Sequence, residues 1–211
     1  MNFLAHLLMG SNSPEQALGS LLGDFVKGPV QQIALPEGVR GGIWLHRRID
    51  GFTDSHALVL QSKARVSPQR RRFAGIMVDM FYDHLLARHW QQFSELPLAE
   101  FSQQSYRHLL QQRDIIPENA WPVIRHMSEH DWLTSYAQLP HLHRALDNMS
   151  KRLRRDNAMP GSVAELEADY AAFEQDFFRF MPQVQAFAAD QAALLSSGAA
   201  DFTVPSGNPR A

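Results

Sequence analysis

The sequence predicts an all-α fold, with a single helical-bundle domain over residues 1–195 and a flexible tail over residues 196–211. Apolar residues recur at intervals of three and four along nearly the whole chain, which is the period of a helix. Ser-Pro and Ser-x-x-Glu signals, typical of helix starts, precede several of these segments. No segment of useful length alternates apolar and polar residues as a half-buried strand does. The 211 residues are enough to enclose one substantial core.

Start and stop signals divide the chain into a series of predicted helices. The clearest start is Ser13 followed by Pro14, and a capping box at Ser162 opens a long final helix that is expected to bend near Pro182. The predicted helices cover residues 14–27, 37–51, a segment capped by Thr53 or Asp54, 67–93, 98–112, 118–136, 140–155 and 162–195. The ending SSGAADFTVPSGNPRA is rich in Ser, Gly and Pro, which predicts a disordered tail.

Composition excludes several classes of protein. The net charge of −2 provides no global polycation, so we expect no nucleic-acid partner. Cysteine is absent, so any metal must be held by His, Asp, Glu or Asn. No segment approaches the roughly 18 apolar residues of a membrane span, and the N-terminus lacks the basic region of a signal peptide. We therefore expect a cytoplasmic enzyme or binding protein with no membrane association; the sequence does not predict its oligomeric state.

Polar side chains lie within apolar sequence on several predicted helices. They are His6, Asp24, His46, Asp50, Asp79, Asp83 and His84. His46 and Asp50 are four residues apart and share a helix face. Asp24 lies near the C-terminal end of its predicted helix, where the helix dipole favours a nearby cation. Asp79 and Asp83 are like charges four apart, which destabilise a helix unless something positive lies between them.

Several helices that each contribute one or two His or Asp residues can build a metal site in the core of a bundle. Such ligands suit Mn²⁺, Mg²⁺ or Fe²⁺, or Zn²⁺ in a catalytic setting. Arg47 and Arg48 follow His46 directly and would bind phosphate oxygens as two-pronged donors. The pattern therefore favours a metal-dependent phosphohydrolase.

Simpler interpretations of the same residues stay open. His46 and Asp50 also fit an exposed pair on a helix surface. A lone Asp24 is typical of a surface carboxylate, and His6 by itself fits a core histidine bonded to a backbone carbonyl.

A second histidine pair lies outside this group. His126 and His130 have the four-residue spacing of a zinc-binding helix. Met127 stands where the H-E-x-x-H motif needs its catalytic Glu, so we assign this pair a structural role.

Four blocks of the chain together resemble the bacterial acyl-carrier-protein phosphodiesterases. They are MNFLAHL, LLGDFVKG, HRRID with Thr53-Asp54 following, and VDMFYDHLLARHW. The resemblance extends from residue 1 to about residue 190 and implies a divergent helical relative of the HD-domain metal phosphohydrolases. It implies hydrolysis of the phosphodiester between 4′-phosphopantetheine and a serine of holo-acyl carrier protein. It also implies Mn²⁺ as the metal, and the ligand types leave Mg²⁺ or Fe²⁺ as alternatives.

The resemblance also implies roles for individual residues. Asp24 matches the aspartate of the L-x-D-F block and is the first candidate for catalysis, with Arg47 and Arg48 as stabilisers of negative charge. The blocks match Asp24, His46, Asp50, Asp83 and His84; with His6, which is included for its place in apolar sequence, these are the predicted metal ligands. HD enzymes carry the order H…HD…D, whereas here the dyad is Asp-His and an aspartate comes first. The individual ligands are therefore left open.

An acidic carrier protein would be attracted by a basic rim. The predicted rim consists of Arg65, Arg70, Arg71 and Arg72, with Lys63 and the Lys151–Arg155 cluster as further candidates. A solvated helix surface explains many such residues equally well. Two rival functions remain: an HD-type hydrolase of a nucleotide or another small phosphodiester, and a non-catalytic helical module that binds an acidic protein.

Overall fold

A computed structural model describes residues 1–10, 13–152 and 157–203 of the chain. These residues form helices joined by turns and include no strand, which confirms the predicted all-α fold. The α-helices are α1 (Phe3–Met9), α2 (Pro14–Leu22), α3 (Glu37–Ser55), α4 (Ala57–Arg65), α5 (Ala74–Arg88), α6 (Leu98–Leu110), α7 (Trp121–Glu129), α8 (Trp132–Ser135), α9 (Leu139–Arg152), α10 (Val163–Ala168) and α11 (Tyr170–Ser196). Short 3₁₀ helices occur at Val30–Gln32, Arg71–Phe73, Trp90–Gln92 and Arg113–Ile115.

Helix α2 starts as predicted but ends earlier than predicted. The Ser13 hydroxyl oxygen accepts a hydrogen bond from the Gln16 N–H at 3.2 Å, and Pro14 occupies the first helical position. The helix ends at Leu22 rather than near residue 27. Asp24 therefore lies on the turn that follows the helix, where its carboxylate can face a neighbouring helix.

Helix α3 continues through Gly51, so the predicted stop at this residue is wrong. The continuation lets Phe52 stack on Phe187 of α11, with ring centroids 4.4 Å apart. Thr53 is buried inside the helix instead of capping the next one. The cap of α4 is His56, whose side chain accepts a hydrogen bond from the backbone of that helix.

Three other predicted helices are shorter or divided in the structure: 67–93, 118–136 and 162–195. The α-helical part of the first begins only at Ala74. The second is interrupted at Asp131, whose φ of 44° is left-handed and incompatible with a continuing helix. The third is interrupted at Asp169, and Pro182 lies inside the long helix α11 that follows.

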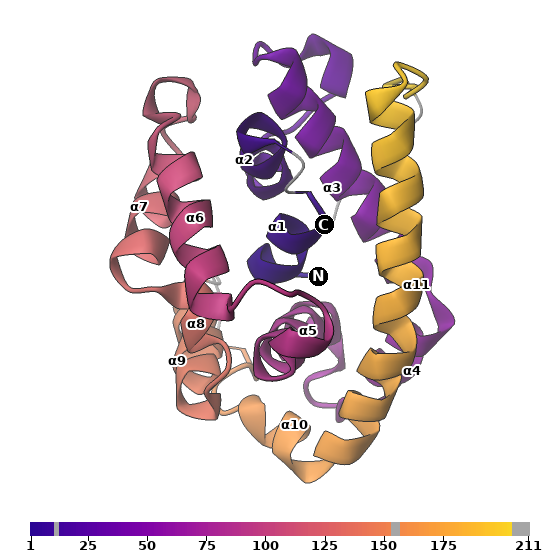
Figure 1. Cartoon of the computed structure of the whole chain (residues 1–211). Coiled ribbons are helices and arrows are strands. Elements are labelled where there is room, and N and C mark those ends of the chain that lie inside the picture. The colour runs from indigo at the N-terminus through magenta and orange to yellow at the C-terminus, as the bar shows by residue number, and fades with distance from the viewer. Residues whose placement is uncertain (11–12, 153–156, 204–211) are drawn as a thin grey trace.

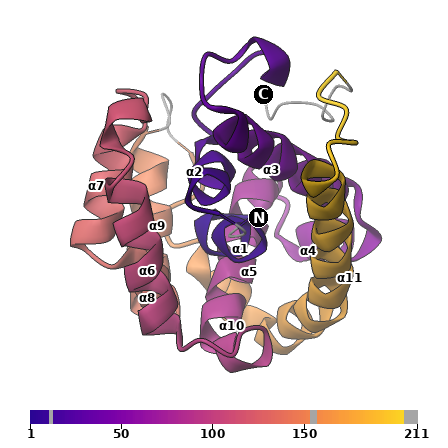
Figure 2. The same ribbon diagram turned by 45° about the horizontal axis from the view of Figure 1, so that its top comes forward.

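Helix α1 lies in the middle of the molecule, between α6–α9 on one side and α11 on the other (Figures 1 and 2). Helices α2 and α3 cross beside it with almost no space between their backbones. A Cβ on Gly42 would lie 2.2 Å from the Gln16 carbonyl oxygen, and one on Gly19 would lie 2.1 Å from the Val39 carbonyl oxygen. The close crossing holds the following turn of α3, which carries the HRRID motif, against α1 and the end of α2.

Part of the predicted tail contacts α3. The Trp44 Nε1–H donates a hydrogen bond to the Asp201 carbonyl oxygen at 3.0 Å, and the Phe202 ring lies edge-on to the Trp44 ring. Residues 204–211 lie outside the described residues. None of the helices that the structure describes has the length and apolar content needed to cross a membrane.

Candidate metal centre

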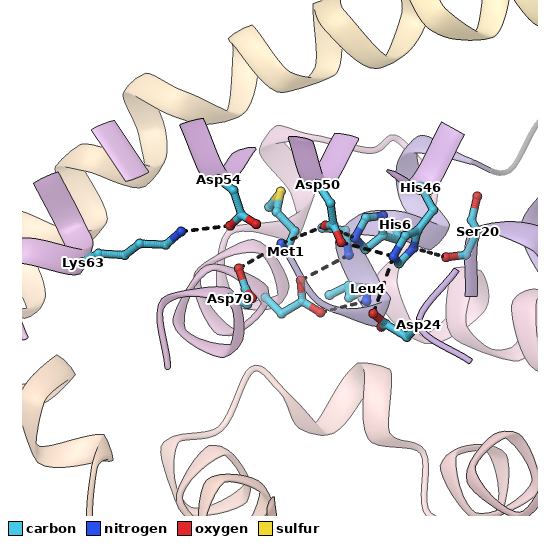
Figure 3. A network of polar contacts seen from close by, with 12 residues as sticks. Met1, Leu4, His6, Ser20, Asp24, His46, Asp50, Asp54, Lys63 and Asp79 are labelled. Carbon is cyan, nitrogen blue, oxygen red and sulfur yellow. Dashed lines mark hydrogen bonds and ion pairs between the residues drawn. The ribbon is translucent and has the colours of Figure 1, made fainter. Parts of the chain in front are cut away.

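Two histidines from separate helices meet in the interior. His6 of α1 and His46 of α3 are both buried, and their rings stack with centroids 3.8 Å apart and an interplanar angle of 18° (Figure 3). Gly23 makes this arrangement possible, because a Cβ there would lie 2.3 Å from carbon atoms of the His46 ring. The ring is also held by its Nδ1, which lies 2.6 Å from the Ser20 carbonyl oxygen.

Two carboxylates face these rings. Asp50, one helical turn after His46, places Oδ2 at 3.3 Å from His46 Nε2 and Oδ1 at 3.1 Å from His6 Nε2. Asp24 reaches over from the turn after α2, with Oδ1 at 3.6 Å from His46 Nε2. The spacing of His46 and Asp50 therefore does bring them together, and the fold adds His6 and Asp24 from two other segments.

The orientation of His46 leaves a position for a proton or a metal ion between these groups. A carbonyl oxygen can only accept, so His46 Nδ1 must carry the proton that is donated to Ser20. In the neutral ring, Nε2 then presents a lone pair to the oxygens of Asp24 and Asp50, and this buried atom has no well-formed hydrogen bond. Lone pairs and negative charge facing one another are stable only around a proton or a metal ion. A backbone carbonyl that orients a histidine is also the usual outer support of a metal ligand.

The pKa values of the cluster show the opposing effects of burial and of neighbouring charged groups. Burial alone lowers the pKa of His46, but the carboxylates of Asp24 and Asp50 outweigh it and raise the pKa to about 10. Burial and the neighbouring His46 lower the pKa of His6 to about 4, so this ring is neutral and able to bind a metal. Burial would raise the pKa of Asp50 and of Asp24, but the surrounding positive groups lower both below the ordinary range.

The donor set fits a divalent transition metal. His6, His46 and Asp50 each offer one ligand atom, and these atoms lie within 4.8 Å of one another. Imidazole and carboxylate without thiolate suit Mn²⁺, Fe²⁺ or a catalytic Zn²⁺. Asp24 is the adjoining carboxylate, and 43% of its side chain is exposed, so it lies between the two buried imidazoles and solvent.

Asp83, a predicted ligand, instead holds α1 in place. Its carboxylate accepts hydrogen bonds from the N–H groups of Leu4 at 2.8 Å and Ala5 at 3.3 Å, the first turn of α1. Burial raises the pKa of Asp83 to about 7, although these N–H groups favour the carboxylate. Its contacts thus position the helix that carries His6 and do not place Asp83 within the His6–His46–Asp50 triad.

The Asp79 carboxylate lies near a positive group, as the like-charge argument requires. The α-ammonium of Met1 is 2.9 Å from Asp79 Oδ1 and 3.7 Å from Asp50 Oδ1. His84, another predicted ligand, is not brought to the triad. Its Nδ1 donates to the Tyr136 carbonyl oxygen at 2.7 Å, and its Nε2 lies 3.1 Å from the Tyr170 hydroxyl.

The two arginines next to His46 are also directed elsewhere. Arg47 donates to the carbonyl oxygens of Val26 and Gly28, both at 2.7 Å, and so holds the loop that follows Asp24. Arg48 donates to the Gln191 side chain of α11 at 3.1 Å. These contacts differ from the predicted phosphate clamp, because adjacent residues on a helix point about 100° apart and His46 alone takes the inward direction.

The predicted basic rim is largely engaged within the protein. Arg65 forms ion pairs with Asp169 and Asp176, both at 3.0 Å. Arg70 pairs with Glu165 at 2.9 Å and also donates to backbone carbonyls, as does Arg71. The Arg72 guanidinium lies 6.0 Å from the Phe73 ring centroid. In the Lys151–Arg155 cluster, residues 153–156 lie outside the described residues.

A cavity of about 810 Å³ adjoins the cluster. Its described lining includes Asp24 and Asp79, and a mostly apolar surface from α1, α5, α7, α8 and α9. The lining also includes the basic and imidazole side chains of His126, His130, His141, Arg144 and Lys151. The sequence does not predict that these side chains share a cavity with Asp24, because they lie about a hundred positions further along the chain. The only local signal was the spacing of the His126–His130 pair.

Known proteins resemble this chain over most of its length. The sequence model of a family described as "Acyl carrier protein phosphodiesterase" matches residues 1–184. A protein of that name from Serratia proteamaculans is 38% identical over 192 residues, which cover 90% of this chain and 99% of the relative. Proteins of the same name from an Enterobacter species and from Pectobacterium atrosepticum are each 36% identical, over 87% and 90% of this chain and 95% and 99% of their own lengths. No solved structure matches the chain.

Proposed function

Because the chain belongs to the acyl carrier protein phosphodiesterase family, we propose that it removes 4′-phosphopantetheine from holo-acyl carrier protein by hydrolysis. The observation that carries this proposal is the His6–His46–Asp50 triad, whose two imidazoles are buried, with the exposed Asp24 beside it lining a cavity. We also propose that the reaction takes place in the cytoplasm.

We propose that His6, His46, Asp50 and Asp24 hold a divalent cation, with Mn²⁺ as the first candidate. When bound, such an ion would polarise a phosphoryl oxygen and lower the pKa of water. Asp50 holds both imidazoles in place through its two oxygens. The support of His46 by Ser20, and of α1 by Asp83, keeps the two rings in fixed orientations.

Hydrolysis forms a bond from water oxygen to phosphorus and breaks the bond from phosphorus to the serine oxygen. One proton must leave the attacking water, and one must reach the departing serine. Asp24 is the cluster carboxylate that also lines the cavity, and its lowered pKa keeps it ionised near neutral pH. We assign it the task of orienting the water and of passing the water's proton on to the departing serine oxygen.

The cavity provides room for the pantetheine arm. Its volume of about 810 Å³ lies within the roughly 300–1,000 Å³ of ordinary ligand pockets. The apolar lining suits the methyl and methylene groups of the arm. Arg144 and Lys151 of α9 add positive charge to the same cavity, where an acidic carrier protein would approach. Docking on Arg65 and Arg70–Arg72 stays a prediction from the sequence.

The direct test is incubation of holo-acyl carrier protein with the enzyme and Mn²⁺, followed by intact mass measurement. We expect loss of the complete phosphopantetheine arm and release of the apo protein. Cyclic and linear nucleotide diesters serve as comparison substrates for the rival hydrolase. Retention of the arm with a folded, metal-saturated enzyme would exclude the proposed reaction, and faster turnover of a nucleotide would favour the rival.

A further inference from the structure

A second group of metal-ligating side chains lies on α7, outside the core cluster. His126, Glu129 and His130 occupy positions i, i+3 and i+4 of this helix and its end, so they share one face. All three are exposed, and one ligand atom from each lies within 4.8 Å of the others. The two imidazole centroids are 4.0 Å apart.

The histidines of this group already have restricted orientations. His130 Nδ1 donates to the His126 carbonyl oxygen at 3.0 Å, since a carbonyl can only accept, and Nε2 of the neutral ring therefore carries the lone pair that binds metals. The His126 ring packs edge-on against Trp132, with centroids 5.3 Å apart. Glu129 has an exposed partner, Arg125, at 3.6 Å, and such a surface pair is weak enough to be displaced.

We propose that His126, Glu129 and His130 form a second, exposed binding site for Zn²⁺. Two imidazoles and a carboxylate are a common donor set for this ion, and exposure leaves at least one coordination position for another ligand. The missing Glu at position 127 excludes the H-E-x-x-H hydrolytic arrangement but not metal binding. The structural role assigned from the sequence is thus extended to a binding role.

The position of the site indicates what a bound ion would do. His126 and His130 line the same cavity as Asp24, and Arg144 and Lys151 line it as well. A zinc ion here would add positive charge to the part of the cavity that these side chains line. Its open coordination position could bind an anionic oxygen, such as that of a carboxylate or phosphate. It is separate from the core cluster, because it shares no residue with the His6–His46–Asp50 triad.

Calorimetric titration of Zn²⁺ into the untagged, full-length protein tests the proposal. The test variant is His126→Gln/His130→Gln, and the matched control is His143→Gln, an exposed histidine on the neighbouring helix α9. We expect the double variant to bind one equivalent of zinc fewer than the natural chain. The affinity at this site should fall by at least ~100-fold, since loss of an outer partner alone costs about 10–100-fold. The control should match the natural chain.

Because the readout is a difference in stoichiometry, it does not depend on the core centre. If the core binds no metal, the natural chain still takes up one equivalent and the double variant none. Equal zinc stoichiometry and affinity in the natural chain and the double variant would overturn the proposal. Circular dichroism of the double variant verifies that the exposed substitutions leave the helical content unchanged.

Discussion

Replacement of Gly23 by alanine tests how the fold holds the candidate metal centre. The backbone of Gly23 is right-handed helical, with φ −51° and ψ −34°, so alanine is compatible with its conformation and only the added methyl group matters. That Cβ would lie 2.3 Å from carbons of the His46 ring, whereas ordinary contact begins at 3.4 Å, so the ring must move by about 1 Å. The movement would disturb the 2.6 Å contact of His46 with Ser20 and both carboxylate contacts.

The expected effects of Gly23→Ala follow from this displacement. An extra methyl group in a packed interior costs about 1–3 kcal/mol of unfolding free energy. A displacement of about 1 Å at a catalytic group lowers the rate by about 100-fold. We therefore expect lower stability in urea unfolding, weaker Mn²⁺ binding by calorimetry, and a large loss of turnover measured by intact mass.

Gly75→Ala is the matched control for this substitution. Gly75 lies in the first turn of α5, and the nearest atom to an added Cβ is Lys63 Cε at 4.0 Å. Alanine there should leave metal binding unchanged and raise the stability by up to about 1 kcal/mol. If Gly23→Ala binds Mn²⁺ and turns over substrate as the natural chain does, the proposed packing of His46 is refuted.

Four further predictions concern charges. Asp24→Asn should lower turnover by about 100-fold or more while the protein stays folded, as checked by intact mass and circular dichroism; near-normal turnover would contradict the role of Asp24. Mn²⁺ at 100 times its Kd should raise the unfolding free energy by about 2.7 kcal/mol, and a chelator should reverse the shift in the melting temperature. Arg65→Met leaves the buried Asp176 without its cation and should lower the free energy of unfolding, measured in urea, by about 3 kcal/mol. A higher KM at unchanged stability would instead favour the predicted docking role of Arg65. Burial raises the pKa of Glu165, but hydrogen bonds from Ser67 and Arg70 outweigh it and lower the pKa. The stability that Glu165 contributes is therefore present above its unfolded pKa of 4.5 and is lost as the pH falls through the lower folded pKa. The difference in unfolding free energy between the natural chain and Glu165→Gln should accordingly shrink between pH 6 and pH 3. A difference that stays constant over this range would contradict the prediction.

Local spacing predicted part of the candidate site. The four-residue interval between His46 and Asp50 was sufficient to predict that these two side chains lie side by side. Residues with this spacing share one helix face whatever the fold around them. Asp24 was identified by its place at a helix C-terminus, and the structure has it on the turn just beyond α2. His6 was identified only as a histidine in apolar sequence, which fits a ligand and a core residue equally.

The contacts of the remaining predicted residues depend on the direction in which each side chain points from its helix. Local spacing does not specify which direction leads into the site. Asp83 and His84 are adjacent on α5, yet one binds the start of α1 and the other binds Tyr136 and Tyr170. Arg47 likewise points to the loop after Asp24 although its neighbour His46 points inward. Because successive helical side chains diverge by about 100°, only the positions of the packed helices decide which of two neighbours enters a site.

The sequence by itself determined the all-α class, because the apolar period of a helix is a local property of the chain. It also determined which side chains had the chemistry of metal ligands, and its blocks were sufficient to identify the family. Tertiary structure alone decided that α1 is buried in the centre, that Gly23 lets the His46 ring approach α2, and that α7 and α9 close a cavity beside Asp24. These features depend on contacts between residues far apart along the chain, and such contacts arise only when the helices pack.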